Sequence, residues 1–466
     1  MRRIWAVART TLREAVRTRT AGVILVTVLA VVVLSPFVLR STGTLPERVR
    51  LVLNYSLSAV GFLLSILTVF LATSTLAGDI REKRIETIAT KPIPRWQIVV
   101  GKWIGVMLLN VGLVVVAGVF SYVLVRHVIG RPSLAKGHEE REQLEEEVYA
   151  ARHTVDPTMP MADFDEIIDE EIRRRRLAGE MPEGLTEQEL RKRRRVQFRT
   201  HYNSLPPGEG RGREMEHVTP ASRDESLFVR YKVIASGPLE ERPEDNTVEL
   251  GWIVAPVKAA SHPDQFRRTT KGTMGDFHEF AVPARVVGSD GLVYIWCINM
   301  DPRLVDVGFP AEEGVQLLYT AGTFEWNFVR TMLLLLVRLA FLSALGLAAA
   351  AVLSFPVASL FVVFVFICAL SVNHFVVLSS PIGGTEEHPI FQSPAGYRPI
   401  LKAVAAVVPN FGKYDGTADL ATGRFVSWRL VVRGLIVVGA IYGGAVMALG
   451  CLYFAGRELA DADSGG

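Results

Sequence analysis

The chain has 466 residues, a formal net charge of +3, 49% hydrophobic residues and 21% charged residues. Its mean hydropathy of +0.27 is high for a chain with that share of charges, so the apolar residues must be concentrated in particular segments. This composition excludes a uniformly disordered chain and argues against a purely soluble enzyme. Three cysteines, Cys297, Cys368 and Cys451, are too few for a disulfide framework.

The first predicted element is a basic amphipathic helix within residues 1–19. On a helical wheel the apolar side chains, among them Val7, Ala8 and Leu12, fall on one half and the arginines on the other. Such a helix directly before an apolar run is typical of one that lies in a membrane surface, where arginines reach anionic headgroups. The residues expected at that surface are Arg2, Trp5, Arg9, Arg13 and Arg17.

Five long stretches contain no Asp, Glu, Lys or Arg. Four of them, residues 20–39, 51–78, 103–125 and 434–456, are each long enough for one membrane-spanning helix, which needs about 20 apolar residues. The fifth, residues 339–385, fits two helices with a break near Ser354–Pro356. We therefore expect six transmembrane helices, three within 20–127, two within 326–379 and one at 431–456. The first run is long for the apolar part of a signal peptide and lacks a convincing cleavage site, so we expect it to be retained.

The flanking charges predict the orientation of these helices. Residues 1–19 carry six arginines, and the loop 79–102 carries six lysines or arginines, which places both in the cytoplasm. With six spans the 457–466 tail is also cytoplasmic, and residues 131–325 are extracytoplasmic. The basic residues between 386 and 433 run against this assignment, but long loops obey the charge rule poorly.

The cytoplasmic loop, residues 78–101, carries the most informative motif. It predicts a short charged helix over 79–89 that ends before Pro92 and Pro94, and then the third span. The loop resembles the coupling segment of ATP-binding-cassette type-2 exporter permeases, in which a Pro-Ile/Val-x-Arg sequence precedes Gly-Lys at the start of a span. The matching residues are Pro92, Ile93, Arg95, Gly101 and Lys102. Lys83 and Arg84 stand where the family has Gly-Thr.

The resemblance extends to the basic surface helix, the six-span layout and the LSFPVAS break. It covers residues 1–127 and 326–457 but not the 131–325 insertion, which family members commonly lack. It implies a half-transporter that pairs with a second copy or a related permease and with two cytoplasmic ATPase subunits. ATP and magnesium would then bind to the partner ATPase, and no cofactor to this chain. The residues that the resemblance assigns to ATPase coupling are Arg81, Glu82, Lys83, Arg84, Ile85, Glu86, Pro92 and Arg95.

The sequence itself agrees with ATP binding by a partner subunit, because it contains no Gly-x4-Gly-Lys-Ser/Thr phosphate loop. Gly101-Lys102 is followed by Trp103, and Gly412-Lys413 by Tyr414. Spacing also indicates no Ser/His/Asp or Cys/His arrangement. We therefore expect no intrinsic catalytic site. The resemblance further points to a prokaryotic cytoplasmic membrane.

The insertion has two parts of different composition. Residues 131–225 hold seventeen basic and twenty-two acidic residues, with acids four positions before bases, which predicts solvated helices stabilised along their length by ion pairs. The basic runs 173–176 and 191–195 fit such helices better than a nucleic-acid site, and residues 204–213 suggest a loop. Residues 226–325 predict a small β-sandwich, with strands at 227–235, 248–254, 277–287, 292–298 and 315–319.

Several single residues within the predicted membrane part are candidates for function. Arg338 lies inside the fourth span, where a charge needs a polar partner or a cavity; Asn110 on the third span is one candidate partner, and snorkelling to the interface is the alternative. Both are candidates for a translocation path or gate. Gly439 and Gly443 have the spacing of a helix-packing motif. Within the outer loop 380–430, residues 396–416 suggest a short re-entrant helix ended by Pro409. Glu386, Glu387 and His388 fit a solvated turn better than a metal site.

The sequence therefore predicts a membrane α-helical protein with an inserted extracytoplasmic α+β domain, and leaves several functions open. The first is the permease subunit of an ATP-driven exporter. The second is a subunit that transmits ATP-driven motion to the outer domain, which acts on an envelope lipid or protein without conduction. The third is a membrane-anchored binding scaffold without an ATPase, and the fourth is a membrane enzyme, for which no catalytic cluster is found.

Overall fold

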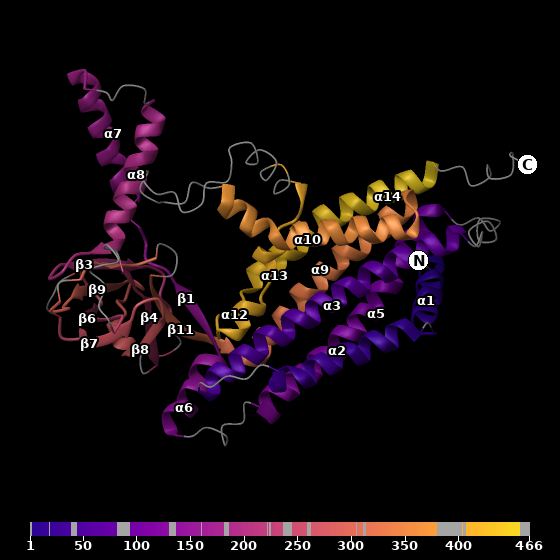
Figure 1. Ribbon diagram of the computed structural model, residues 1–466, viewed down its shortest axis with the longest axis horizontal. Coiled ribbons are helices and arrows are strands. Elements are labelled where there is room, and N and C mark those ends of the chain that lie inside the picture. Colours follow the sequence, from indigo (N-terminus) through magenta and orange to yellow (C-terminus); the bar gives the residue numbers. More distant parts are fainter. Residues whose placement is uncertain are drawn as a thin grey trace, which may run out of the picture. The chain divides into compact units, whose positions relative to one another are not determined.

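The computed structural model describes residues 2–17, 19–38, 44–81, 94–129, 137–159, 161–180, 186–220, 222, 225–235, 245–258, 262–303, 305–310, 314–379, 403 and 407–456. The chain divides into two compact units. A helical unit comprises Met1–Ala151 and Gly322–Gly466, and a second unit comprises Arg152–Ala321. Figure 1 shows the helices of the first unit and the strands of the second.

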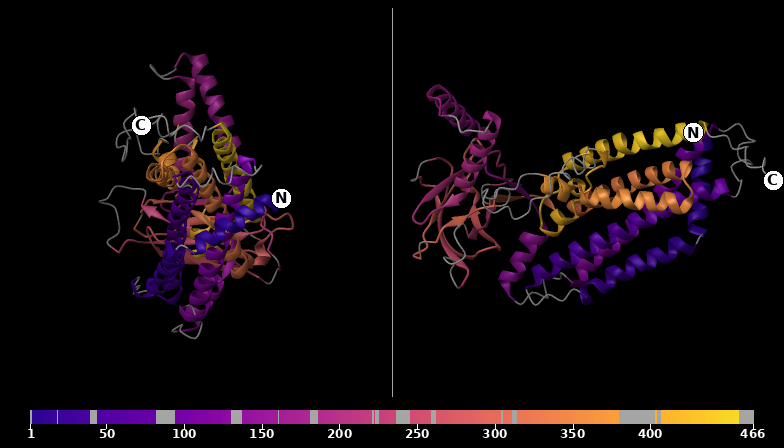
Figure 2. Two further views of the ribbon diagram at one scale, coloured as in Figure 1. Left: turned by 90° about the vertical axis from the view of Figure 1, so that its right-hand side faces the viewer. Right: turned by 45° about the horizontal axis from the view of Figure 1, so that its top comes forward.

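The first half of the helical unit consists of α1 (Arg2–Arg17), α2 (Arg19–Val38), α3 (Leu45–Arg81) and α5 (Arg95–Val123), which continues as the π-helical η1 (Leu124–Ile129). α1 runs across the ends of the longer helices in both figures that show the whole chain (Figures 1 and 2). Two short helices follow, α6 (His138–Gln143) and η3 (Leu144–Val148).

The second half consists of α9 (Phe324–Val352), α10 (Phe355–Ser379) and a final helix. That helix starts as α13 (Trp428–Gly434), widens into the π-helical η7 (Leu435–Gly443) and ends as α14 (Gly444–Gly456). α9 and α10 are separated at the break that the sequence predicts, and Pro356 occupies the first turn of α10, where a proline costs no helical hydrogen bond.

Five helices among the described residues are long and apolar enough to cross a membrane. They are Leu45–Arg81, Arg95–Ile129, Phe324–Val352, Phe355–Val372 and Trp428–Gly456. These match five of the six predicted spans and give the chain the character of a multi-pass membrane protein. The first predicted span coincides with α2, in which only the shorter stretch Leu25–Pro36 meets the apolar criterion, so a sixth span stays a prediction.

The second unit is built on two four-stranded sheets, with strand orders β1-β11-β4-β8 and β3-β9-β6-β7. Their strands are β1 (Ala150–Val155), β3 (Gly210–Met215), β4 (Ser226–Lys232), β6 (Thr247–Ala255), β7 (Phe266–Thr273), β8 (Phe277–Pro283), β9 (Val293–Asn299) and β11 (Val315–Thr323). A small third sheet joins β2 (Ser204–Leu205), β10 (Val307–Gly308) and β5 (Ile234–Ala235).

Alternating apolar side chains of the two larger sheets form one core. Trp252 of β6, Tyr231 of β4 and Phe280 of β8 lie at its centre, and the first two are almost completely buried. At its edge, Arg303 donates hydrogen bonds to Asp301 (2.9 Å) and Asp245 (2.6 Å). The hydrogen bond from Arg303 lowers the pKa of Asp301. Hydrogen bonds from the Thr247 hydroxyl and from Arg303 lower the pKa of Asp245.

Two antiparallel helices, α7 (Met161–Ala178) and α8 (Glu187–Asn203), form a charged hairpin in this unit. Thr186 begins α8 with a reciprocal cap to Glu189. The sequence predicts ion pairs along each helix, and Arg175–Glu171 in α7 has that spacing. Four others join the two helices: Arg176–Glu187, Arg191–Asp169, Arg194–Glu171 and Arg195–Asp165. Ion pairs between the two helices, which the sequence did not predict, therefore accompany the pairing along them.

The boundary between helical and β segments also differs from the prediction. β1, β2 and β3 come from residues 131–225, where only charged helices and a loop were predicted. β3 pairs with β9 over six residues, and Arg213 and Met215 on its inner side are buried. The charge-rich composition hid this strand, because its glycines and arginines are poor strand formers in isolation.

Candidate coupling and gating sites

A buried ion pair joins α3 and α5 close to the point where residues 82–93 connect them. Lys102 Nζ lies 2.5 Å from an Asp79 carboxylate oxygen and donates a hydrogen bond of 2.9 Å to the carbonyl of Thr75. Only 4% of the Lys102 side chain and 11% of the Asp79 side chain are exposed. Separation of the two side chains would leave each charge buried without a partner, which is strongly destabilising, so the pair holds α3 and α5 together.

Arg95, the first residue of α5, fixes the same end of the helical unit to the last helix. Its guanidinium donates hydrogen bonds to the carbonyls of Phe454 (3.1 Å) and Ala455 (3.0 Å), at the C-terminal end of α14. A cation at this position satisfies carbonyls that lack helical partners and interacts favourably with the helix dipole. Asp79, Lys102 and Arg95 thus join α3, α5 and α14 close to the residues between which positions 82–93 lie in the chain.

The N-terminal helix α1 packs directly against this part of α5. A Cβ atom at Gly101 would lie 2.7 Å from the Val7 side chain, and one at Gly105 would lie 2.7 Å from the Ala8 carbonyl. Two glycines one helical turn apart therefore allow the helix backbones to approach closely. The contact occupies part of the apolar face that the sequence assigns to the membrane surface.

The remaining α1 residues keep the predicted amphipathic pattern. Trp5 is 59% exposed, and the four arginines expected at the membrane surface are all exposed: Arg2, Arg9, Arg13 and Arg17. α1 therefore has one face on α5 and a second face, basic with one large aromatic side chain, that remains accessible in the helical unit.

Of the residues assigned to ATPase coupling, Arg81 and Arg95 lie in the described part of the chain. Arg81 is the exposed last residue of α3, and Arg95 has the α14 contacts given above. The other six, Glu82, Lys83, Arg84, Ile85, Glu86 and Pro92, lie outside the described residues. Sequence reasoning missed Asp79 and used Lys102 only as a motif residue. The sequence signal for this pair was the opposite charge of Asp79 and Lys102 at the two ends of one loop.

The second candidate site surrounds Arg338. This residue lies 14 positions after the start of α9, about 21 Å along the helix. Its Nη2 donates a hydrogen bond of 2.8 Å to an Asp415 carboxylate oxygen, and its side chain is 10% exposed. The sequence offered Asn110 as a candidate partner, and the structure corrects this: Asn110 instead accepts a hydrogen bond from the Thr68 hydroxyl (3.0 Å).

Asp415 belongs to a segment that reaches the middle of α9 and α10. Phe411 donates its backbone N–H to Ala369 of α10 and stacks edge-on against Phe341 of α9. A short 3₁₀ turn, η6 (Gly412–Tyr414), and α12 (Thr417–Ala421) flank Asp415. The sequence predicts a re-entrant helix within residues 396–416, ended by Pro409; most of the part before Pro409 lies outside the described residues. Residues 407–421, which carry Asp415, are named the Asp415 segment.

Polar contacts from the first half of α9 hold the chain just after this segment. Asn327 donates to the Arg424 carbonyl and accepts from the Val426 N–H, each at 2.7 Å. Arg330 donates to the Val426 carbonyl (3.1 Å) and lies over the Phe425 ring. α9 is therefore attached to residues 424–426 by hydrogen bonds to their uncharged backbone groups and to Asp415 by an ion pair.

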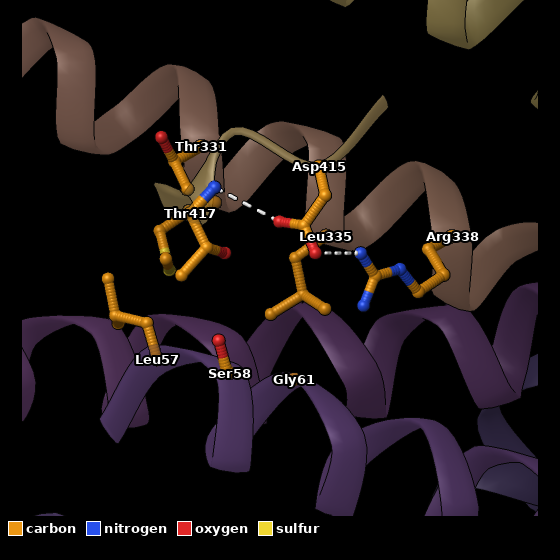
Figure 3. Close-up of a pocket in the computed structure, with 9 residues that line it drawn as sticks. Leu57, Ser58, Gly61, Thr331, Leu335, Arg338, Asp415 and Thr417 are labelled. Atoms are coloured by element: carbon orange, nitrogen blue, oxygen red, sulfur yellow. Dashed lines mark hydrogen bonds and ion pairs between the residues drawn. The ribbon is translucent and has the colours of Figure 1, made fainter. Parts of the chain in front are cut away.

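A small cavity lies beside the Arg338–Asp415 pair (Figure 3). α3 contributes Leu57, Ser58 and Gly61 to its lining, and α9 contributes Thr331, Leu335 and Arg338. Asp415 is oriented toward it by the backbone N–H of Thr417, at 3.0 Å. A Cβ at Gly61 would lie 3.7 Å from Arg338 Nη1, so the glycine leaves room for the guanidinium.

The predicted packing glycines are only partly involved in helix contacts. A Cβ at Gly443 would lie 3.9 Å from the Phe341 backbone of α9, whereas one at Gly439 would meet only Leu435 of its own helix. The close approach in this region is at Gly450, where a Cβ would lie 2.8 Å from Ala348 of α9. Gly450 escaped the sequence prediction because its nearest small partners lie on another helix.

No group of three or more His, Cys, Asp or Glu side chains in the described segments is arranged to hold a metal. Glu386, Glu387 and His388 lie outside those segments. Comparisons with protein-family models and with curated proteins found no match to this chain.

Proposed function

We propose that this chain is the membrane subunit of an ATP-driven exporter of the ATP-binding-cassette type-2 class, which couples ATP hydrolysis by a separate cytoplasmic ATPase to export. The observation that carries the proposal is the set of contacts made by Asp79, Lys102 and Arg95, which flank residues 82–93 in the chain. The Asp79–Lys102 pair and the Arg95 contacts join three membrane-length helices, α3, α5 and α14, and residues 82–93 connect the first two of them in the chain. A force applied to the segment by a soluble partner would therefore reach those helices.

Under this proposal the 82–93 segment faces the cytoplasm and residues 131–325 face the outside of a prokaryotic cytoplasmic membrane. Two copies of the chain, or one copy and a related permease, assemble with two ATPase subunits. Substrate passes between the two membrane subunits. ATP and magnesium bind to the ATPases, and α1 contacts anionic lipid through its exposed basic face.

A second candidate function is favoured by the second unit, which has its own hydrophobic core. A subunit of the same class could transmit ATP-driven motion to this domain, which would then act on an envelope lipid or protein without conduction. The two functions share the coupling site and differ in whether a substrate crosses the membrane.

Co-purification with candidate cassette ATPases in nanodiscs tests the proposal. The wild-type chain should retain an ATPase, and a variant with Arg81, Glu82, Arg84 and Glu86 changed to Ala should lose it. Arg429→Ala, an exposed arginine of α13, serves as a matched control for the loss of positive charge and should retain the ATPase. Failure of the wild type to retain any ATPase would reject both functions and favour a membrane-anchored binding scaffold.

A further inference from the structure

We propose that the cavity beside Arg338 is a binding site for an oxyanion, a phosphate or carboxylate group, and that Asp415 occupies the place of this anion in the present structure. Binding as such is a property of the helical unit alone. The further step, that the oxyanion belongs to the exported molecule, rests on the proposed export function.

The first observation is the state of the Arg338 side chain. The guanidinium is nine-tenths buried on a membrane-length helix, and its recorded ion pair is with Asp415. A buried guanidinium requires a negative partner, and its planar donors suit the oxygens of carboxylates and phosphates in pairs. Nη2 of Arg338 donates one hydrogen bond to the Asp415 carboxylate, whereas Nη1 faces the space above Gly61.

The second observation is the chemistry of the cavity wall. Ser58 and Thr417 line the cavity with hydroxyl-bearing side chains, and Gly61 and Leu335 complete the wall, while the Thr331 hydroxyl donates to backbone carbonyls of Asn327 and Gly416 (Figure 3). Hydroxyl groups can donate to the remaining oxygens of a phosphate or carboxylate. Ser58 is exposed on α3, which gives the cavity an opening at the surface of the helical unit.

The third observation is the position of Asp415 in the chain. Its side chain is 33% exposed and is carried by the Asp415 segment, residues 407–421, whereas Arg338 is part of a 29-residue helix. If this segment moves outward, Asp415 leaves with it and Arg338 stays. An incoming oxyanion can then replace the lost carboxylate, so that movement of the segment and binding of the anion favour each other.

The test uses the full chain in nanodiscs of phosphatidylcholine and follows the apparent melting temperature. One arm titrates inorganic phosphate, and the other replaces part of the lipid with phosphatidylglycerol. A response to phosphate identifies a soluble oxyanion, and a response to phosphatidylglycerol alone identifies a lipid headgroup; either supports the site if it depends on Arg338. Asp415→Asn removes the competing carboxylate and should lower the half-saturating anion concentration about tenfold, since a hydrogen-bonded charge contact has at least that effect.

The double variant Arg338→Gln/Asp415→Asn removes both charges, so it leaves no buried charge unpaired, and it should show no saturable response. Arg433→Gln, an exposed arginine of α13, should respond as the wild type does. An equal response of the double variant and the wild type, or no response in the wild type, would overturn the site. Equal half-saturation in Asp415→Asn and the wild type would overturn the competition. The wild type and the double variant decide the question even if Asp415→Asn fails to fold, and no ATPase is needed, so failure here is separate from failure of the proposed function.

Discussion

Removal of one partner of the Asp79–Lys102 pair should destabilise the helical unit strongly. The two side chains lie 2.5 Å apart with 11% and 4% of their surfaces exposed, so solvent screens the interaction little. Loss of one partner from such a pair costs about 3–5 kcal/mol, because the other charge stays buried without compensation. We expect this effect for Lys102→Met and for Asp79→Asn.

The double variant Lys102→Met/Asp79→Asn provides the decisive comparison. It buries no unpaired charge, so its loss of stability should be smaller than the sum of the two single losses by at least ~1 kcal/mol. The assay is equilibrium unfolding in mixed detergent micelles, followed by tryptophan fluorescence, with the exposed Lys413→Met as the control. Single variants within ~1 kcal/mol of the wild type, or strictly additive losses, would refute the reasoning.

Three further predictions concern other contacts. Gly105→Leu should release α1 from α5 at a cost of about 1–3 kcal/mol, while Gly112→Leu, on an open face of α5, should not; limited proteolysis of the N-terminal helix distinguishes them. Thr186→Ala should cost about 1 kcal/mol by removing the cap of α8, which hydrogen exchange in that helix would reveal; unchanged exchange would contradict it. Because Arg303 lowers the pKa of Asp301 in the folded state, this stabilisation is complete above the ordinary carboxyl pKa and is lost as the pH falls through the lowered one. Arg303→Gln should therefore shift acid unfolding of the second unit to higher pH, and an unchanged midpoint in pH-dependent hydrogen exchange would exclude this role.

The sequence predicts the membrane-length helices well, because hydropathy over about 20 residues is a property of each segment alone. The break before Pro356 is likewise predicted from the sequence of its own segment. The strands at 227–235 and 248–254 correspond to β4 with β5 and to β6, since alternation marks a half-buried strand without knowledge of its partner.

What the sequence could not predict depends on pairs of residues far apart in the chain. Asp415 lies 77 positions from Arg338, and its segment is held on α9 by contacts between residues far apart in the chain, among them Phe411 with Phe341. Residue spacing identifies side-chain neighbours only within about one helix turn. It therefore gave no reason to prefer Asp415 to Asn110, or to any other polar residue of another span, as the partner of Arg338. β1 and β3 were missed for the same reason, because their partners β11 and β9 lie far along the chain.

The unbroken length of α3 has a mechanical consequence. The helix runs for 37 residues, about 55 Å, and its single proline, Pro46, lies in the first turn. Near one end Asp79 is held by Lys102, further along Gly61 faces Arg338, and near the other end Leu53 and Leu57 share a core with Leu420 of α12. A continuous helix of this length can rotate as one rigid body. A rotation of ~5° about its middle would displace each end by about 2.4 Å, which is enough to break a hydrogen bond at either end without bending the helix.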